Sequence, residues 1–187
     1  MSKIRKSRTK ILIVSICVLL IFIIFGAWFW GGKSHLSIFF SLPQKTVASD
    51  DFSLTIDRID VHVPIIEGVD PTNEIEYDQK LSNGVAHMIG SAVPGVGGNI
   101  FIYGHSSADL PSPYAKIFAN IDQLMPGDKI VVRYLNKDYN YLVTGQKVIN
   151  SDDFSVLANA GHETLTLMTC WPVGTSDKRL VVFADRK

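Results

Sequence analysis

Acidic residues are missing from the start of this 187-residue sequence, and none precedes Asp50. Five basic residues lie within the first ten positions, so the formal net charge of zero averages two unlike parts. Without these five, 13 basic and 18 acidic residues leave a net charge of −5 for the rest of the chain. Binding to nucleic acid requires a clustered positive field, so this mildly acidic body argues against a nucleic-acid partner.

Charged residues are also absent from Ile11–Trp30, an unbroken apolar run of 20 residues. A helix rises about 1.5 Å per residue, so this run spans roughly 30 Å, the thickness of the hydrocarbon core of a bilayer. The rival interpretation is a cleaved signal peptide, whose apolar region is usually about 7–15 residues long. The run here is longer and ends on Trp28, Phe29 and Trp30, aromatics of the kind that lie at membrane interfaces. We therefore expect an uncleaved transmembrane anchor.

The basic flank predicts how this anchor is oriented, because Lys and Arg are retained on the cytoplasmic side of the membrane. We expect residues 1–10 to be cytoplasmic, residues 11–30 to span the membrane, residues 31–50 to form a tether and residues 51–187 to form one extracellular domain. No second apolar span follows. The prediction is a single-pass protein of the cell membrane.

Cysteine is scarce, and Cys17 and Cys170 are the only two. Cys17 falls within the predicted membrane span and Cys170 in the outer domain, which excludes a disulfide between them. Cys170 is therefore a free thiol in an oxidising compartment, where an unpaired cysteine is a liability unless it is used. The alternative is a small buried hydrophobic residue, as most free cysteines are.

The outer domain has the pattern of a β protein. Short runs rich in β-branched and aromatic residues, bounded by turn formers, predict strands at Phe52–Ile56, Val61–Ile66, Asn99–Tyr103, Lys129–Leu135, Tyr139–Ile149, Thr164–Thr169 and Arg179–Phe183. Apolar residues at roughly helical spacing predict one helix over Pro113–Leu124, and Asp152–Asn159 is a second, shorter candidate. No internal repeat is visible, so we expect a mainly β domain with one or two short helices, closed or sandwich-like.

Strand alternation places Cys170 on the face opposite Leu165 and Leu167, at the end of its strand and beside a loop that contains Pro and Gly. A position at such a rim suits a nucleophile better than a core residue. Arg179 begins the last strand and could hold an oxyanion, because its guanidinium is always charged and offers a fork of donors. An ordinary surface arginine is the alternative.

A reactive thiol needs a base or a positive neighbour, since its reference pKa is about 8.5. His105 ends its own apolar strand as Cys170 does, and it is a candidate together with His87. Position in the sequence does not choose between these two. The other histidines are expected to be structural or solvated: His35 in the tether, His62 within a strand and His162 in a turn.

The string from Thr166 to Cys170 reads Thr-Leu-Met-Thr-Cys, which matches the Thr-Leu-x-Thr-Cys signature of sortases. Other landmarks of that family follow in order: Gly104-His105 at a strand end, Gly127-Asp128 after the predicted helix, and the terminal strand from Arg179. The chain resembles a sortase from about residue 52 to residue 184. Asn83–His87 and Gly90–Ala92 depart from the usual Gly-Pro-Gly-His and Gly-Thr-Ala, which concerns the subclass rather than the chemistry.

The resemblance implies an eight-stranded β-barrel of the sortase type and assigns roles to residues. Cys170 corresponds to the nucleophile, His105 to the general acid and base, and Arg179 to the group that orients the substrate and steadies the oxyanion. His87 corresponds to a histidine that family members do not use as the catalytic one. Thr169 and Trp171, which flank Cys170, are expected to contact the substrate.

The reaction that the resemblance implies is transpeptidation through a Cys170 thioester. The donors would be secreted proteins that carry a C-terminal Leu-Pro-x-Thr-Gly-like sorting signal, and the acceptor an amine of a peptidoglycan precursor or of another protein. The short tether and the lack of a second span favour the wall-anchoring type over the pilus-building type. A different extracytoplasmic cysteine enzyme and a non-enzymatic anchored β-domain are the rival classes; papain-like enzymes place Cys before His, the reverse of the order here.

No metal or other cofactor is needed for this chemistry. An acidic stretch could bind calcium, as in some family members, but it lacks the spacing of a dedicated calcium loop: Asp70, Glu74, Glu76 and Asp78. We expect this stretch to be a solvated loop.

Overall fold

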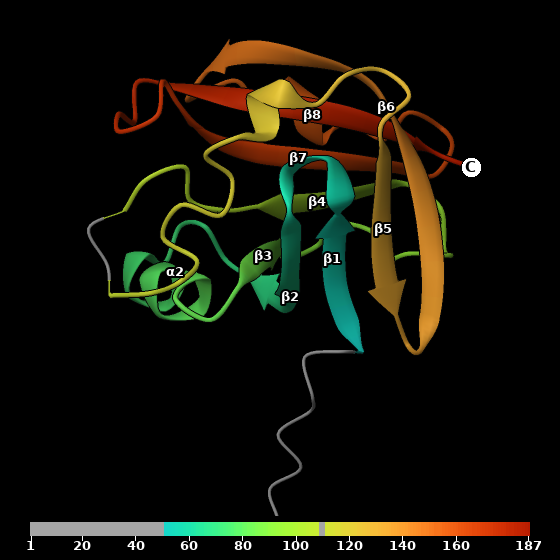
Figure 1. Cartoon of the computed structure of the whole chain (residues 1–187), viewed down its shortest axis with the longest axis horizontal. Coiled ribbons are helices and arrows are strands. Elements are labelled where there is room, and N and C mark those ends of the chain that lie inside the picture. Colours follow the sequence, from blue (N-terminus) through green and yellow to red (C-terminus); the bar gives the residue numbers. More distant parts are fainter. Residues whose placement is uncertain (1–50, 109–110) are drawn as a thin grey trace, which may run out of the picture. The chain divides into compact units, whose positions relative to one another are not determined.

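The computed structural model describes residues 51–108 and 111–187 (Figure 1). The predicted membrane span at residues 11–30, the tether at residues 31–50, Cys17 and His35 lie outside the described residues. Within the described ranges, no helix is both long and apolar enough to cross a bilayer.

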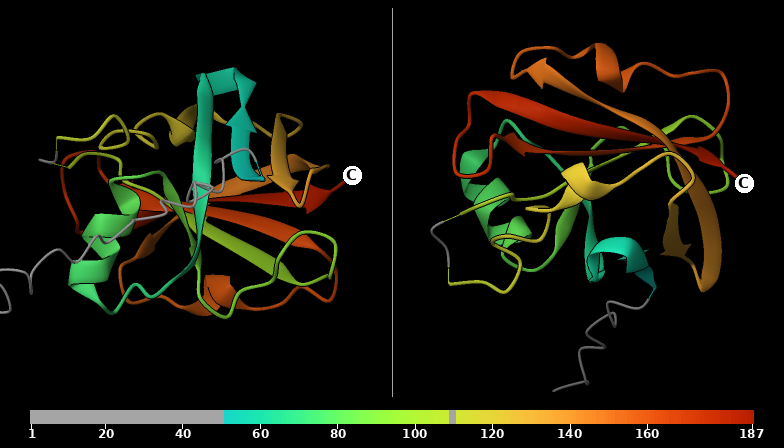
Figure 2. Two further views of the ribbon diagram at one scale, coloured as in Figure 1. Left: turned by 90° about the horizontal axis from the view of Figure 1, so that it is seen from below. Right: turned by 45° about the horizontal axis from the view of Figure 1, so that its top comes forward.

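Eight strands within the described residues close into one barrel, which Figures 1 and 2 show from three directions. The order around the barrel is β1-β2-β3-β4-β7-β8-β6-β5. The strands are β1 (Phe52–Ile56), β2 (Val61–Val69), β3 (Val85–Met88), β4 (Asn99–Tyr103), β5 (Lys129–Tyr134), β6 (Lys137–Asn150), β7 (Thr164–Trp171) and β8 (Lys178–Arg186). The mainly β, eight-stranded barrel is confirmed.

Two of the strand pairs are parallel, β2 with β3 and β4 with β7, and the others are antiparallel. The β4–β7 register runs from Asn99 opposite Thr164 to Tyr103 opposite Met168. Parallel neighbours end at the same edge of a sheet, so the residues that follow Tyr103 and Met168 leave the barrel at one end. This pairing brings together two segments 65 residues apart in the sequence.

Alternation along the strands gives the barrel two packed faces. Leu54, Ile100 and Leu165 belong to the interior cluster, and each is fully buried. Phe101 and Tyr103 point outward and are also buried, because a second cluster covers the outer face of β4. The α2 helix (Glu74–Leu81) and the 3-10 turn η3 (Ser155–Leu157) supply residues to this outer cluster.

The helix predicted over Pro113–Leu124 is wrong. This segment forms successive turns that end in the 3-10 helix η2 (Ile121–Gln123), and the backbone bonds within these turns join residues three apart. Its buried residues are also three apart, namely Ala115, Phe118, Ile121 and Leu124. Three residues per turn is the period of a 3-10 helix, whereas an α-helix needs 3.6.

Two elements were missed and one was shorter than expected. The acidic stretch expected to be a solvated loop contains α2, which begins after the N-cap residue Asn73, whose side chain accepts from the Glu76 amide. The four-residue strand β3 was also not predicted. The second candidate helix, Asp152–Asn159, contains only the 3-10 turn η3, and a further 3-10 turn, η1 (Asp57–Ile59), follows β1.

The turn between β5 and β6 offers a test of backbone strain. Leu135 and Asn136 are its two central residues and have φ angles of 49° and 61°, the left-handed region that a type I′ turn requires. Leu135 is 72% exposed, so its side chain adds little burial. We expect Leu135→Asn to raise the free energy of unfolding by about 1 kcal/mol in urea denaturation of the full-length chain. Leu135→Ala is the control for loss of the leucine side chain, and equal stability of the two variants would contradict this explanation.

Candidate active site

Cys170 lies opposite Arg179 in the antiparallel pair of β7 and β8. Opposed residues of such a pair point to the same face, with Cβ atoms about 4.5–5.5 Å apart. Both residues are half-buried, whereas Leu167 and Thr169, on the interior side of β7, are buried. The structure therefore places Cys170 on the outer face near the end of its strand, as the alternation predicts.

His105 is brought to the same end of the barrel by bonds between the ends of β4 and β7. The Gly104 amide donates to the Met168 carbonyl at 3.1 Å, and the Thr169 hydroxyl donates to the Gly104 carbonyl at 2.8 Å. Gly104 has no room for a side chain, because a Cβ atom there would lie 2.8 Å from the Phe118 ring. The residue before His105 is thus fixed to the residue before Cys170.

The His105 imidazole is held by packing rather than by hydrogen bonds. Its Nε2 atom is buried, and no hydrogen bond to the ring is present among the described residues. Burial lowers the pKa of His105 below its usual value, and the charge of Asp78 acts in the opposite direction. The ring of Tyr77 meets the imidazole edge-on, with the ring centroids 5.7 Å apart. An imidazole in this state is neutral near pH 7 and can accept a proton.

Arg179 is turned toward the loop that joins β7 to β8. Its Nη1 atom donates to the carbonyls of Ser176 at 2.9 Å and Lys178 at 3.0 Å. These bonds involve one nitrogen of a group with five N–H donors. The guanidinium is therefore anchored beside Cys170 and keeps donors for an anion.

A pocket with a volume of about 580 Å³ opens beside Cys170. Its walls come from the outer face of β4, β7 and β8, from α2 and from the segment around η3. They are mostly apolar, with these principal contributors: Tyr77, Met88, Ile89, Phe101, Tyr103, Phe154, Leu157, Met168, Cys170 and Arg179. His105 is not part of the lining, but its neighbours Gly104 and Tyr77 are. An extended apolar peptide segment suits such a pocket.

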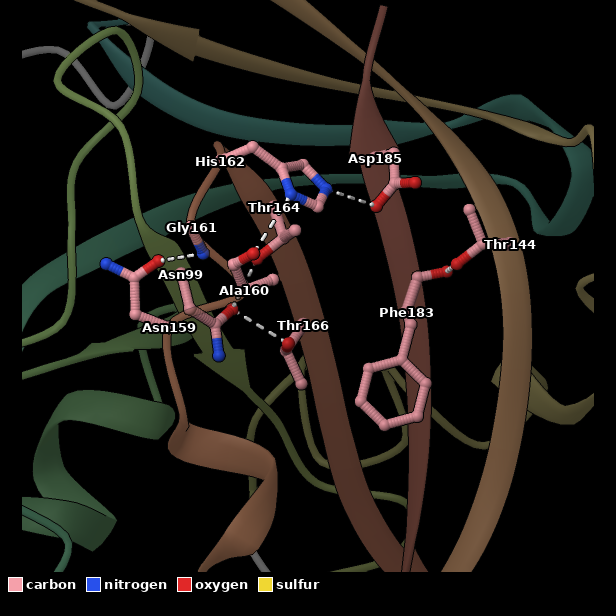
Figure 3. Close-up of polar contacts among 10 residues, drawn as sticks. All are labelled: Asn99, Thr144, Asn159, Ala160, Gly161, His162, Thr164, Thr166, Phe183 and Asp185. Carbon is pink, nitrogen blue, oxygen red and sulfur yellow. Dashed lines mark hydrogen bonds and ion pairs between the residues drawn. The ribbon is translucent and has the colours of Figure 1, made fainter.

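His87 and His162 lie elsewhere. His87 is buried on β3, where its Nε2 atom is 2.8 Å from the Ala92 carbonyl and its ring packs near Phe52 in the interior cluster. His162 is exposed and its Nε2 atom lies 3.3 Å from Asp185, as Figure 3 shows. Of these two and His105, only His105 emerges at the end of β4 beside the pocket.

A buried asparagine strengthens the pairing of β4 with β7. Asn99 is 9% exposed, and its Oδ1 atom accepts from the Thr166 hydroxyl at 2.8 Å and the Thr164 hydroxyl at 3.4 Å (Figure 3). Its Nδ2 atom donates to the Val156 carbonyl at 3.0 Å. One side chain thus connects both strands to the segment around η3 that walls the pocket.

The two residues expected to contact substrate differ in their surroundings. Thr169 belongs to the pocket lining, but it is 3% exposed and its hydroxyl is engaged with Gly104. Trp171 is half-buried and packs against the interior cluster of the barrel. Both side chains therefore have structural contacts next to Cys170, and their contact with substrate stays a prediction.

The acidic stretch considered for calcium forms part of a capped helix. Asp70 accepts from the Thr72 amide and hydroxyl at 2.8 and 2.7 Å, and Glu76 lies 3.9 Å from Lys80. Across the described part of the chain, no three His, Cys, Asp or Glu side chains gather as a metal site.

Tyr77 is the residue beside His105 that the sequence analysis missed. A signal for it exists, since Asn73 and Glu76 have the spacing of a capping box ahead of the apolar pair Tyr77 and Leu81.

The bond between Thr169 and Gly104 leads to a test of stability. Thr169→Val keeps the shape of the side chain but leaves the buried Gly104 carbonyl without its donor, so we expect a loss of about 1–2 kcal/mol in the free energy of unfolding. Thr144→Val is the matched control, because the Thr144 hydroxyl donates to the Phe183 carbonyl at 3.2 Å in an exposed position. Urea denaturation measures both variants, and equal losses would contradict the special role of the buried bond.

The lowered pKa of His105 predicts a pH dependence of stability. Between its folded pKa and the ordinary value of 6.5, the unfolded chain binds more protons, so this group's contribution is present above pH 6.5 and is lost as the pH falls. We expect the unfolding free energy of the wild type, measured relative to that of His105→Gln, to fall as the pH is lowered from 7.5 to 5. A difference that stays constant over this range would show that burial does not disfavour the charged imidazole.

Comparisons with known proteins match the part of the chain that forms the barrel. A family model described as Sortase domain matches residues 54–187. Sortase D of Bacillus subtilis (strain 168) is 28% identical over 137 residues, which make up 71% of this chain and 62% of that protein. Sortase A of Bacillus anthracis is 31% identical over 144 residues, or 77% of this chain and 65% of that protein. The match thus spans less than two thirds of the length of both.

Solved structures agree with the family model. Sortase C-1 from Actinomyces oris matches with a TM-score of 0.63 and 29% identity, over 73% of this chain and 72% of that chain. A lid mutant of sortase A from Corynebacterium diphtheriae matches with a TM-score of 0.61 and 31% identity, over 74% of this chain and 70% of that chain. The family model covers most of the sequence, and the chain belongs to the sortase family.

Proposed function

We propose that this chain is a cysteine transpeptidase that cleaves a Leu-Pro-x-Thr-Gly-like sorting signal and transfers the acyl part to an amine. The observation that carries the proposal is the meeting of Cys170, Arg179 and the residues beside His105 at one rim of the barrel, next to a mostly apolar pocket. Family membership supports the same chemistry.

In the first half of the proposed reaction, the Cys170 sulfur attacks the carbonyl carbon of the Thr–Gly bond. Its thiol proton passes to His105, which is neutral in the free protein because burial lowers its pKa. The carbonyl electrons move to oxygen, and N–H groups of Arg179 donate to that oxyanion. The C–N bond then breaks, His105 gives its proton to the leaving amine, and a thioester remains on Cys170.

In the second half, an acceptor amine attacks the thioester carbonyl. His105 takes a proton from the attacking nitrogen, the carbon–sulfur bond breaks, and His105 returns that proton to the departing Cys170 sulfur. The products are a new amide bond and the regenerated enzyme. This sequence consumes no oxidant, reductant or metal ion.

The setting of the reaction is part of the same proposal. The donors are secreted proteins with a C-terminal sorting signal, and residues 11–30 anchor the enzyme in the cell membrane with its catalytic domain outside. As acceptor we propose an amine of a peptidoglycan precursor, in line with the wall-anchoring type predicted from the sequence. Thr169 and Trp171 would border the bound signal next to Cys170.

A trapping experiment tests this proposal. Full-length protein in detergent is incubated with peptides that carry Leu-Pro-x-Thr-Gly-like signals, with and without hydroxylamine as the acceptor. We expect mass spectrometry to show an acyl adduct on Cys170 and, with hydroxylamine, a peptide hydroxamate. Cys170→Ala should abolish both products, because the nucleophile is lost.

The controls separate the catalytic thiol from the fold. Arg179→Lys keeps a positive charge but loses the forked donors, and we expect it to lower kcat/KM by about 10²–10³-fold, as removal of one oxyanion donor does. His162→Gln removes a histidine far from the pocket and should leave the rate unchanged. Hydroxamate formation by Cys170→Ala at the wild-type rate would refute the assigned mechanism.

A further inference from the structure

The α2 helix fixes an aromatic side chain next to His105. Tyr77 and Leu81 are four residues apart and therefore share one face of the helix. Leu81 is fully buried in the outer cluster, and Tyr77 packs against the same cluster. In Figures 1 and 2, α2 lies at the same end of the barrel as the loop between β7 and β8. Cys170 and Arg179 form the second strand pair from this loop.

The Tyr77 ring has two aromatic contacts of different geometry. It stacks on Tyr103, with the centroids 5.6 Å apart and the planes 11° apart, and it meets His105 at 5.7 Å and 79°. Tyr103 is itself fixed, since it is 3% exposed and its hydroxyl donates to the Val69 carbonyl at 3.3 Å. Tyr77 is therefore held on a buried platform and presents its ring to the imidazole.

The contact with Tyr77 matters for the His105 ring because no polar side chain within the described residues bonds to it. A histidine that transfers protons is commonly oriented by a hydrogen bond from its second nitrogen to a carboxylate or a carbonyl. No such bond to His105 is present among the described residues, and its Nε2 atom is buried. Aromatic pairs favour this edge-to-face arrangement, which fixes the angle between the two rings.

We propose that Tyr77 is a positioning residue for the transfer reaction: its ring holds the His105 imidazole in the orientation needed for proton transfer beside Cys170. The inference rests on the proposed function, in which His105 carries the proton. Tyr77 also forms part of the pocket wall with Cys170 and Arg179, so one side chain contacts the imidazole and borders the bound substrate.

The charged and titratable groups around this pair come from four elements: Asp78 on α2, Tyr103 on β4, Cys170 on β7 and Arg179 on β8. Burial raises the pKa of Tyr77 to about 12, so its phenol stays neutral throughout any practical assay. Burial lowers the pKa of His105 against the charge of Asp78. Removal of the Tyr77 ring would admit water to the imidazole and move its pKa back toward 6.5.

The test combines an NMR titration of His105 with steady-state kinetics on the full-length protein in detergent. The chain is labelled with carbon-13 histidine, and the His105 signal is assigned by its loss in His105→Gln. Three variants are compared: Tyr77→Phe keeps the ring, Tyr77→Ala removes it, and Ile75→Ala alters an α2 residue that is 76% exposed. Kinetics use a signal peptide with hydroxylamine.

We expect Tyr77→Ala to raise the titration midpoint of His105 and to lower kcat between about 10- and 100-fold, as a misplaced catalytic group does. Ile75→Ala should behave like the wild type in both measurements. Tyr77→Phe should keep the wild-type titration midpoint of His105, because the ring is retained. If Tyr77→Ala unfolds, Tyr77→Leu, which keeps the packing on Tyr103 but not the aromatic ring, replaces it with the same expectation.

Two results would overturn the inference. One is an unchanged His105 titration in the variants without the ring, whatever their rates. The other is a loss of kcat in Tyr77→Phe as large as in Tyr77→Ala, because the hydroxyl rather than the ring would then be responsible. The titration needs no turnover. If the wild type forms no hydroxamate but Tyr77→Ala still shifts the His105 midpoint, the proposed function is refuted and the contact between Tyr77 and His105 is supported.

Discussion

The parallel pairing of β4 with β7 is the constraint on which the candidate site depends. It aligns Tyr103 with Met168, so the next residues of both strands leave the barrel side by side. The hydrogen bonds of Gly104 with Met168 and Thr169 extend the contact between the two strands beyond their last paired residues, Tyr103 and Met168. Antiparallel pairing of β7 with β8 then places Arg179 opposite Cys170. His105, which precedes Cys170 by 65 residues, thereby reaches the same rim as Cys170 and Arg179.

A pocket forms at this rim because the outer face of the sheet is only partly covered. The interior cluster fills the barrel and makes a stiff wall of β4, β7 and β8. On the outside, α2 and the segment around η3 bury Phe101 and Tyr103 but leave a space between them that reaches Cys170. Buried outer residues give the pocket an apolar floor, and the strand ends give it reactive groups. The pocket proposed to bind the peptide therefore adjoins the residues proposed to carry out the reaction, Cys170 and Arg179.

The sequence predicted most strands because runs rich in β-branched and aromatic residues, such as those of β4, β6 and β7, lie between clear turn formers. It failed at Pro113–Leu124, where apolar residues three apart fit a 3-10 helix, and at β3, which has only four residues. Alternation placed Cys170 correctly on the outer face. It could not separate His87 from His105, since His87 is buried within the unpredicted strand β3, whereas His105 follows the end of β4. The capping-box spacing at Asn73 and Glu76 is a signal for α2. The contact of Tyr77 with His105 has no such signal, because α2 meets His105 only in the folded chain.

The most direct test of the shared rim is a crystal structure of this protein with a sorting-signal peptide linked to Cys170 through a thiol-reactive analogue of its threonine. The account predicts that the peptide lies in the pocket against Phe101, Tyr103 and Met168. It also predicts that the oxygen of the threonine analogue lies within hydrogen-bond distance of Arg179 and that the His105 ring adjoins the linked sulfur. A peptide that leaves Cys170 away from this pocket, or a His105 ring directed away from the sulfur, would contradict it.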